Sequence, residues 1–243
     1  MNLCITVNTH PNNDPNNEIL AWCQQAIQNT HGINQIFFFA EGANFALPPN
    51  TCAQWSNFII NNQLDAIICS KSGLNLGLHN DSDCNEGYKI GGLGVLIEAA
   101  LEADIAISSN QILSGQSHPL EAPLNQQALT IRLTQPHDSA SANTGLDALA
   151  VALAFGLSPK LEICLQQGQH FFEPRSTEST VSELTSKLAA LTEYGAFETC
   201  IIASPTTPEL EAIAAYLKTA LPTPVQILPP SNKLSTQART LTF

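Results

Sequence analysis

The sequence predicts an α/β protein built from two halves, each with a parallel sheet. Short apolar runs of strand length alternate with segments whose apolar residues recur at helical spacing. This alternation stops in a polar, proline-containing stretch at 111–127 and then begins again. Alternating strands and helices are typical of a parallel sheet that has helices on both faces and right-handed crossovers. We therefore expect halves at 1–110 and 128–243, joined by a linker at 111–127.

The first half contains four expected strands and three expected helices. The apolar run at 36–40 is continuous, which is typical of a strand covered on both faces. In 18–29 the apolar residues have helical spacing, and His31 and Gly32 end that helix. The expected strands are 3–7, 36–40, 64–69 and 104–107, and the expected helices are 18–29, 54–61 and 94–103.

The second half repeats this pattern. The expected strands are 128–133, 161–165, 199–203 and 225–228, and the expected helices are 145–155, 182–191 and 208–221. In both halves an apolar strand leads into a glycine turn and then an aromatic residue, so that 37–45 can be matched with 163–171. Together with the shared order of elements, this match favours an internal duplication.

Composition excludes several classes of protein. Hydrophobic residues make up 44% of the 243 residues and charged ones 12%, which is not the composition of a disordered chain. The formal net charge of −12 would repel phosphate backbones, so we expect no direct binding to nucleic acid. The sequence has no apolar stretch of the roughly 20 residues needed to cross a bilayer and no signal-peptide pattern at its beginning. A cytoplasmic protein that does not enter the membrane is expected.

The cysteines do not form a recognisable framework. Their number, seven, is odd, and no CxxC pair occurs, so structural disulfides are not expected. The six histidines show no HExxH or HxxxH spacing. The sequence therefore predicts neither a metal site nor an organic cofactor.

Cys69 is the strongest candidate for chemistry. It ends the apolar run 64–69 and is followed by a polar, glycine-containing turn, and ligands of α/β sheets bind outside the carboxyl ends of the strands. Lys71 follows two residues later and is a candidate stabiliser of a thiolate. The alternative is that Cys69 is a small buried hydrophobe, as most free cysteines are. The similar run at 200–204 has Ala203 at the position matched with Cys69.

Cys84 is a candidate second thiol. It lies in a polar stretch that also contains Asp81, Asp83 and Glu86, so we expect it to be exposed and its thiolate to be disfavoured. An ordinary loop cysteine is the alternative. The apolar patterns around four other cysteines assign them to the core, and Cys52 is left undecided. These four are Cys4, Cys23, Cys164 and Cys200.

Two further motifs carry weaker signals. The run Gly91-Gly92-Leu93-Gly94 precedes a helix, but it lacks the full GxGxxG pattern and the P-loop lysine. We expect these glycines to allow a tight turn and close packing beside Cys69. His137, Asp138 and Ser139 are adjacent in one loop, where a catalytic triad cannot easily form.

These patterns resemble the DsrE/DsrF/TusD/TusC superfamily of sulfur-relay proteins. In the first half the resemblance to TusD rests on the aromatic strand ending in 39–42, on the strand end at 67–69, and on 91–94 with 98–99. In the second half the resemblance to TusC rests on 145–149, the glycine turn around Gly168, and the final residues 241–243. The chain looks like a TusD–TusC fusion, which implies two flavodoxin-like, DsrE-like halves.

The resemblance implies a function. Members of this superfamily pass persulfide sulfur between proteins during synthesis of 2-thiouridine at the tRNA wobble base. It implies that Cys69 is the active thiol, that the second half is architectural, and that the chain acts in a homomeric or heteromeric oligomer. The implied partners are a TusB-like subunit, a TusA-like sulfur donor and a TusE-like acceptor, with the tRNA held by another component and no cofactor.

Three alternatives remain open at this point. The chain can be a DsrE/DsrF-type component of dissimilatory sulfur oxidation, or a non-catalytic scaffold whose thiols are incidental. A small-molecule hydrolase using the same strand-end pocket is the third, although the sequence offers no convincing pair of nucleophile and base for it.

Overall fold

The computed structural model describes residues 1–47, 53–115, 129–134, 139–165, 186–203, 215, 218, 225–228 and 240–243. The chain divides into two compact units, Met1–Gln126 and Gln127–Phe243. Each unit contains one five-stranded sheet, and every strand pairing in both sheets is parallel. The expected α/β class is therefore confirmed.

The first sheet has the strand order β4-β3-β2-β1-β5. Its strands are β1 (Asn2–Val7), β2 (Gly32–Phe38), β3 (Asp65–Cys69), β4 (Tyr88–Gly91) and β5 (Ile105–Ser108). Flavodoxin shares this layered parallel architecture but has the order 2-1-3-4-5. Here the chain moves outward from β1 through β4 and then returns to the other side of β1, so the order reverses between β1 and β5.

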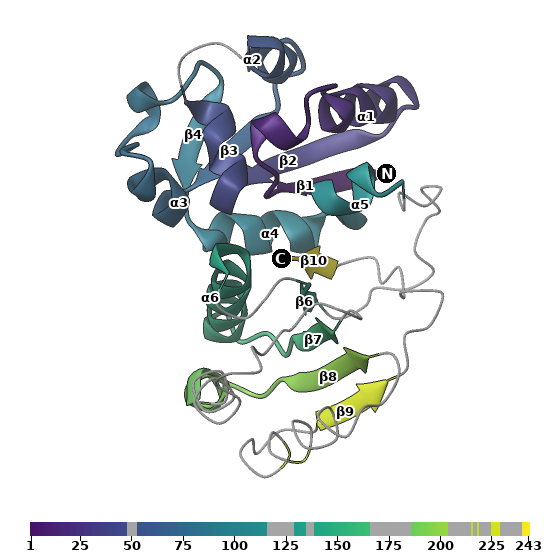
Figure 1. The fold of residues 1–243 in the computed structure, drawn as a ribbon, viewed down its shortest axis with the longest axis vertical. Coiled ribbons are helices and arrows are strands. Elements are labelled where there is room, and N and C mark those ends of the chain that lie inside the picture. Colours follow the sequence, from purple (N-terminus) through teal and green to yellow (C-terminus); the bar gives the residue numbers. More distant parts are fainter. Residues whose placement is uncertain are drawn as a thin grey trace. The chain divides into compact units, whose positions relative to one another are not determined.

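Helices cover both faces of the first sheet. They are α1 (Glu18–Gln28), α2 (Ala53–Asn61), α3 (Ser70–Asn75), α4 (Leu93–Glu102) and α5 (Ser109–Leu113), with short 3-10 helices η1 (Pro11–Asn13), η2 (Ala40–Ala46) and η3 (Asp81–Asp83). Figure 1 shows α1 and α2 on one side of β1–β3 and α4 on the other. The sheet is thus buried on both faces, as the continuous apolar run in β2 predicts.

One core cluster of the first unit lies between the sheet and the α1/α2 layer. Alternate strand residues such as Ile5, Ile36 and Ile68 enter it together with apolar residues of α1 and α2. Phe38 and Trp55 form its aromatic centre, with ring centroids 5.5 Å apart in an edge-on arrangement. Such pairs contribute about 0.5–1.5 kcal/mol beyond the burial of their surface. This packing holds β2 and β3, and with them the end of β3, in a fixed position.

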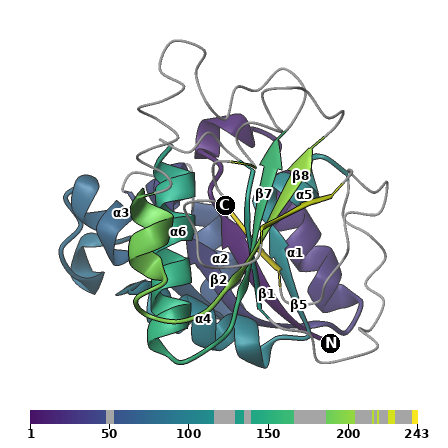
Figure 2. The same cartoon turned by 90° about the horizontal axis from the view of Figure 1, so that it is seen from below.

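The second sheet has the order β10-β6-β7-β8-β9. Its strands are β6 (Thr130–Leu133), β7 (Lys160–Leu165), β8 (Glu198–Ala203), β9 (Val225–Leu228) and β10 (Thr240–Thr242). Helix α6 (Ala140–Ala154) and a helix over 186–191 belong to the same unit, and Figure 2 shows α6 to one side of β7 and β8. Counted within its own unit, each sheet has its strands in the same order, which favours the expected duplication.

The structure differs from the sequence-based expectations in several elements: β2 begins at Gly32 and α6 at Ala140, both earlier than expected. Strands β4 and β10 were not predicted, so the strand expected at 104–107 is the fifth of its sheet and not the fourth. The expected linker began too early, because α5 extends to Leu113 and Ile112 is 7% exposed within the core cluster. Residues 116–128, and the expected helix at 208–221 apart from 215 and 218, lie outside the described residues.

The sequence match that sets Cys69 against Ala203 is shifted by one residue from the correspondence that the structure shows. Helices α1 and α6 both connect the first and second strands of their sheets, so right-handed crossovers place them on equivalent faces. A Cβ on Gly145 of α6 would meet the Leu133 side chain, so Leu133 lies on the face that α6 covers. Residues paired across parallel strands share a face, and the register pairs Leu133 with Ile163 and Ile163 with Ile201. Ile201 therefore lies on the α6 face of its sheet.

The matched residue in the first unit, Ile67, lies on the opposite face. A Cβ on Gly91 would lie 2.6 Å from Ile67 Cγ2 and 3.8 Å from Val95 of α4, whereas the neighbouring Ile68 belongs to the cluster under α1. A shift of one residue restores the correspondence, because a one-residue slip moves every side chain to the other face. Within the described strand, Cys69 then corresponds to Ile202 and not to Ala203, and the second unit still has no thiol there.

Candidate functional site: the end of strand β3

Cys69 is the last residue of β3 and directly precedes α3. Its Cα partner in the neighbouring strand is Gly91, the last residue of β4. Because the strands are parallel, their carboxyl ends meet at one edge of the sheet, where α/β proteins present their functional groups. The sequence delivers the thiol there because Ala66, Ile67 and Ile68 are buried up to the point where the strand ends.

The turn that follows β2 is tied to the helix that follows Cys69. The backbone N–H of Ala40 donates a hydrogen bond of 2.9 Å to Oγ of Ser72 in α3. A Cβ on Gly42 of η2 would overlap the carbonyl group of Val7 at the end of β1. The connections that follow β1, β2 and β3 are therefore packed against one another around the end of the sheet.

The glycine pair beside Cys69 has two different environments. The close approach of Gly91 to Ile67 leaves no room for a side chain, which confirms that this glycine permits close packing beside the thiol. Gly92 is exposed, and a Cβ placed on it would have no atom within 4 Å. The main chain next to Cys69 is thus open to an approaching molecule on the Gly92 side.

Cys69 itself is 2% exposed, so the free chain shields its thiol. Lys71 is exposed on the first turn of α3. Its assignment as a stabiliser of the thiolate stays a prediction. Any reaction partner has to reach the sulfur past the α3 and Gly91–Gly92 turns, since these follow the two strands that end beside it.

Cys84 is half-buried and not exposed as expected. It packs against the core cluster, and its Sγ donates to the carbonyl of Asn80 at 4.0 Å. Burial raises the pKa of its thiol, and the carboxylates of Asp81 and Asp83 raise it further. Cys84 precedes the amino end of β4, whereas Cys69 lies beside the carboxyl end of that strand. Among the described residues no hydrogen bond joins the two thiols.

The four cysteines assigned to the core are all buried. Burial raises the pKa of the Cys4 thiol to about 12 and that of Cys164 to about 11, and it also raises the pKa values of Cys23 and Cys200. A raised pKa leaves little thiolate near neutral pH, and the thiolate is the nucleophile. These thiols are therefore poor candidates for transfer chemistry. Cys52 lies outside the described residues.

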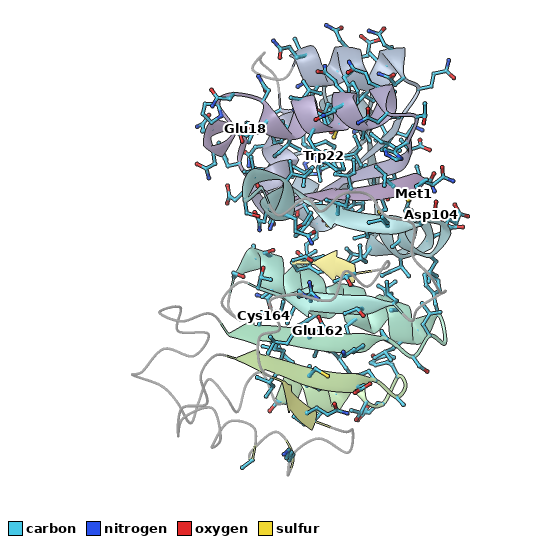
Figure 3. All side chains as sticks on the ribbon, turned by 90° about the vertical axis from the view of Figure 1, so that its right-hand side faces the viewer. Met1, Glu18, Trp22, Asp104, Glu162 and Cys164 are labelled. Atoms are coloured by element: carbon cyan, nitrogen blue, oxygen red, sulfur yellow. The ribbon has the colours of Figure 1, made fainter. Side chains whose placement is uncertain are left out.

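Sequence reasoning missed a buried ion pair in the second unit. Arg132 donates to Oε2 of Glu162 from Nε at 2.8 Å and from Nη2 at 2.6 Å, and Lys160 Nζ lies 3.1 Å from Oε1. Arg132 and Glu162 are Cα partners in β6 and β7 and are 4% and 2% exposed. Figure 3 labels Glu162 and Cys164 on the same strand. The available signal was a charge inside each of two apolar strand patterns.

At the carboxyl ends of the neighbouring strands β1 and β5, polar side chains hydrogen-bond to one another. Ser109 Oγ donates to Asn8 Oδ1 at 2.9 Å and lies 2.9 Å from Thr9 Oγ1. In the other unit, Ser139 Oγ accepts the Ala142 N–H at the start of α6, which is a helix-capping role, and 137–138 lie outside the described residues. Neither place offers an activated serine of the kind that a hydrolase needs.

In the part of the chain that the structure describes, no group of three or more His, Cys, Asp or Glu side chains is arranged to hold a metal ion. No helix within that part has the length and apolar character needed to span a bilayer.

Comparisons with known proteins give no family. No family profile matches the chain, and no curated protein matches it. Among solved structures, the chain is similar to Streptococcus suis SuiB, whose structure was determined bound to S-adenosylmethionine, with 8% identity and a TM-score of 0.30. The match covers 93% of this chain and 47% of the SuiB chain, so this chain spans about half of that protein's length.

Proposed function

We propose that this chain is a sulfurtransferase subunit in which Cys69 accepts persulfide sulfur from one protein thiol and passes it to another. The proposal includes a DsrE-like identity for both units. The observation that supports it most is the place of Cys69, a thiol at the carboxyl end of an interior strand of a parallel sheet, paired with Gly91 and close to the exposed Gly92, where an added Cβ would meet no atom within 4 Å. In open α/β sheets, ligands bind outside the carboxyl ends of the strands.

The proposed reaction needs no oxidant. The Cys69 thiolate attacks the outer sulfur of a donor persulfide, a new S–S bond forms at Cys69, and the donor's S–S bond breaks. The donor cysteine leaves as a thiolate with the electron pair of that bond. An acceptor thiolate then attacks the outer sulfur of the Cys69 persulfide. The outer sulfur moves to the acceptor, and the Cys69 sulfur leaves as a thiolate. Sulfur moves twice and the oxidation level of the system is unchanged.

The second unit has a structural role in this proposal. It shares the strand order of the first unit but has no cysteine at the position that corresponds to Cys69. Its two described thiols, Cys164 and Cys200, are buried and have raised pKa values. We assign it to assembly with a TusB-like subunit, and the donor and acceptor to TusA-like and TusE-like carriers.

The proposed pathway is 2-thiouridine synthesis at the tRNA wobble position, in the cytoplasm, with the tRNA bound by another component. The net charge of −12 supports indirect participation, because direct contact with a phosphate backbone requires basic surface. A DsrE/DsrF-type role in dissimilatory sulfur oxidation uses the same thiol chemistry. Growth on reduced sulfur compounds and the thiouridine content of tRNA in a deletion strain separate the two pathways.

The decisive experiment is intact-mass spectrometry of the purified chain after incubation with a cysteine desulfurase, cysteine and a TusA-type carrier. We expect a gain of one sulfur, mapped by peptide analysis to Cys69 and absent from Cys69→Ser. Cys84→Ser is the matched control and should load normally. Sulfur spread over several cysteines, or normal loading of Cys69→Ser, would leave the scaffold as the better account.

A further inference from the structure

The two units differ sharply in charge. Residues 1–126 contain two lysines, no arginine and eleven acidic residues, a formal charge of −9, whereas residues 127–243 have seven basic and ten acidic residues, a formal charge of −3. Of the two lysines, Lys89 lies 2.7 Å from the carboxylate of Asp65. The unit that carries Cys69 is therefore the strongly acidic one, and its field extends over the end of β3.

Three exposed carboxylates come from elements that meet beside Cys69. Glu41 follows Ala40, whose N–H is bonded to Ser72 of α3. Asp81 accepts the N–H of Ile90, the residue before the Cα partner of Cys69. Glu98 lies on α4, the helix that begins after Gly92. These carboxylates belong to η2, η3 and α4, three elements that follow or precede the strands next to Cys69.

Two apolar side chains are exposed on the helices that follow these strand ends. Leu74 on α3 is 56% exposed and Val95 on α4 is 40% exposed. Both helices begin at the strand ends that meet at Cys69 and Gly91 (Figure 1). Glu41, Leu74, Asp81, Val95 and Glu98 are called the thiol edge below. These residues bring exposed apolar and acidic side chains to the elements that follow β2, β3 and β4, and protein-docking surfaces combine apolar contact with a polar rim.

We infer that the thiol edge docks a basic protein segment that carries a cysteine thiol or persulfide. The inference rests on the proposed function and names the chemical class of its partner. Thiolates and persulfide anions are both repelled by a surface of charge −9, so a carrier without positive charge approaches slowly. Lysines or arginines flanking the carrier's cysteine reverse that repulsion, and Leu74 and Val95 supply apolar contact.

The test uses two synthetic peptides of equal length, each with a central cysteine persulfide, one flanked by lysines and the other by glutamates. Sulfur transfer to Cys69 of the full chain is followed by mass spectrometry at low and at 0.5 M salt. We expect the basic peptide to react at least about tenfold faster at low salt, with the ratio falling towards one at high salt. Equal rates, or a faster acidic peptide, would overturn the inference.

Charge variants test whether the thiol edge is the source of this preference. Glu41→Gln combined with Glu98→Gln should reduce the ratio severalfold. Asp104→Asn makes a similar change at the amino end of β5, beside Met1 in Figure 3, and should leave the ratio nearly unchanged. Leu74→Ser should slow transfer from the basic peptide more than Ile60→Ser, which alters another exposed apolar residue. Equal effects of the edge and control variants contradict the assignment.

Binding separates this inference from the proposed function. The same peptides with serine in place of cysteine bind without any transfer, and their affinity is measured by fluorescence anisotropy. Tight binding of the basic serine peptide with no sulfur on Cys69 would sink the function and keep the docking surface. Loading of Cys69 without any charge preference would keep the function and sink the docking surface. If Leu74→Ser instead dissociates a dimer of the chain, a second copy is the occupant and the inference fails.

Discussion

The two units share one strand order but fill their sheets differently. In the first unit the face opposite α1 carries buried uncharged residues such as Cys4, Thr6 and Phe37. In the second unit the face opposite α6 carries a buried ion pair between Arg132 and Glu162. The comparison teaches that topology is compatible with very different interiors, provided that every buried charge has a partner.

The two units also differ in where their cysteines lie. In the first unit Cys69 is the last residue of its strand and lies close to the exposed Gly92, whereas Cys164 and Cys200 of the second unit lie within their strands and have raised pKa values. In the function proposed above, the first unit keeps the reactive strand end and the second unit serves assembly.

Removing one partner of the buried ion pair should have the largest effect on stability. Arg132→Met leaves the buried Glu162 carboxylate with Lys160 as its remaining partner, and we expect it to destabilise the second unit by about 3 kcal/mol, the lower end of the range for an uncompensated buried charge. Lys89→Gln breaks the exposed pair with Asp65 in the first unit and should cost about 0–1 kcal/mol. Urea unfolding followed by circular dichroism measures the whole chain. Both tryptophans, Trp22 and Trp55, lie in the first unit, so their fluorescence reports that unit separately. Equal effects of the two variants would contradict the prediction.

The glycine pair beside Cys69 gives a matched test within one turn. Gly91→Ala places a Cβ 2.6 Å from Ile67 Cγ2, and we expect it to destabilise the first unit by about 1–3 kcal/mol and to slow sulfur loading of Cys69. Gly92→Ala meets no atom within 4 Å and should change stability little. Tryptophan fluorescence in urea measures both. A Gly92→Ala variant as unstable as Gly91→Ala would show that the two sites do not differ in packing.

Alkaline pH should weaken the first unit through Cys4. Burial raises the pKa of this thiol from 9.0 to about 12, so between these values the folded state keeps a proton that the unfolded state releases. The unfolded state then binds fewer protons, and stability falls as pH rises through this window, by about 1.4 kcal/mol per pH unit for this group. Cys4→Ala should flatten the fall by that amount, while the half-buried Cys84→Ala should change it less. Equal pH slopes for wild type and Cys4→Ala would refute the prediction.

The smallest expected effect belongs to Lys71. If its charge assists the thiolate of Cys69, Lys71→Gln should slow sulfur loading by about two- to fivefold, because the side chain is exposed and its field is screened by water. Lys71→Arg keeps the charge and should load at nearly the normal rate. Stopped-time mass spectrometry of Cys69 loading measures both. Equal rates for the glutamine and arginine variants would remove Lys71 from the site.

Much of the fold was predictable because burial leaves a periodic trace. The runs at 3–7, 64–69 and 225–228 lie within a residue of strands β1, β3 and β9, since each strand is a block of apolar residues. Strand β4 escaped because it is a short edge strand whose Lys89 is exposed, so its pattern is not that of a buried strand. Strand β10 has three residues, too few for any period to be visible.

The candidate site was predictable in part. The strand-end position of Cys69 follows from the apolar run before it, but its neighbour Gly91 follows only from the pairing of β3 with β4. The half-burial of Cys84 was missed because a polar local sequence does not reveal that the core cluster lies beneath it.

The sequence by itself determined the α/β class, the repeated architecture, the concentration of negative charge in the first 126 residues, and the delivery of one thiol to a strand end. These are properties of local pattern and composition, which a linear sequence contains in full. The tertiary structure alone decided which residues meet: Cys69 with Gly91, Arg132 with Glu162, and the phase in which the two halves correspond. Pairing register places residues 22–30 positions apart in contact, and side chains alternate with a period of two, so one residue of shift changes the face on which a side chain lies.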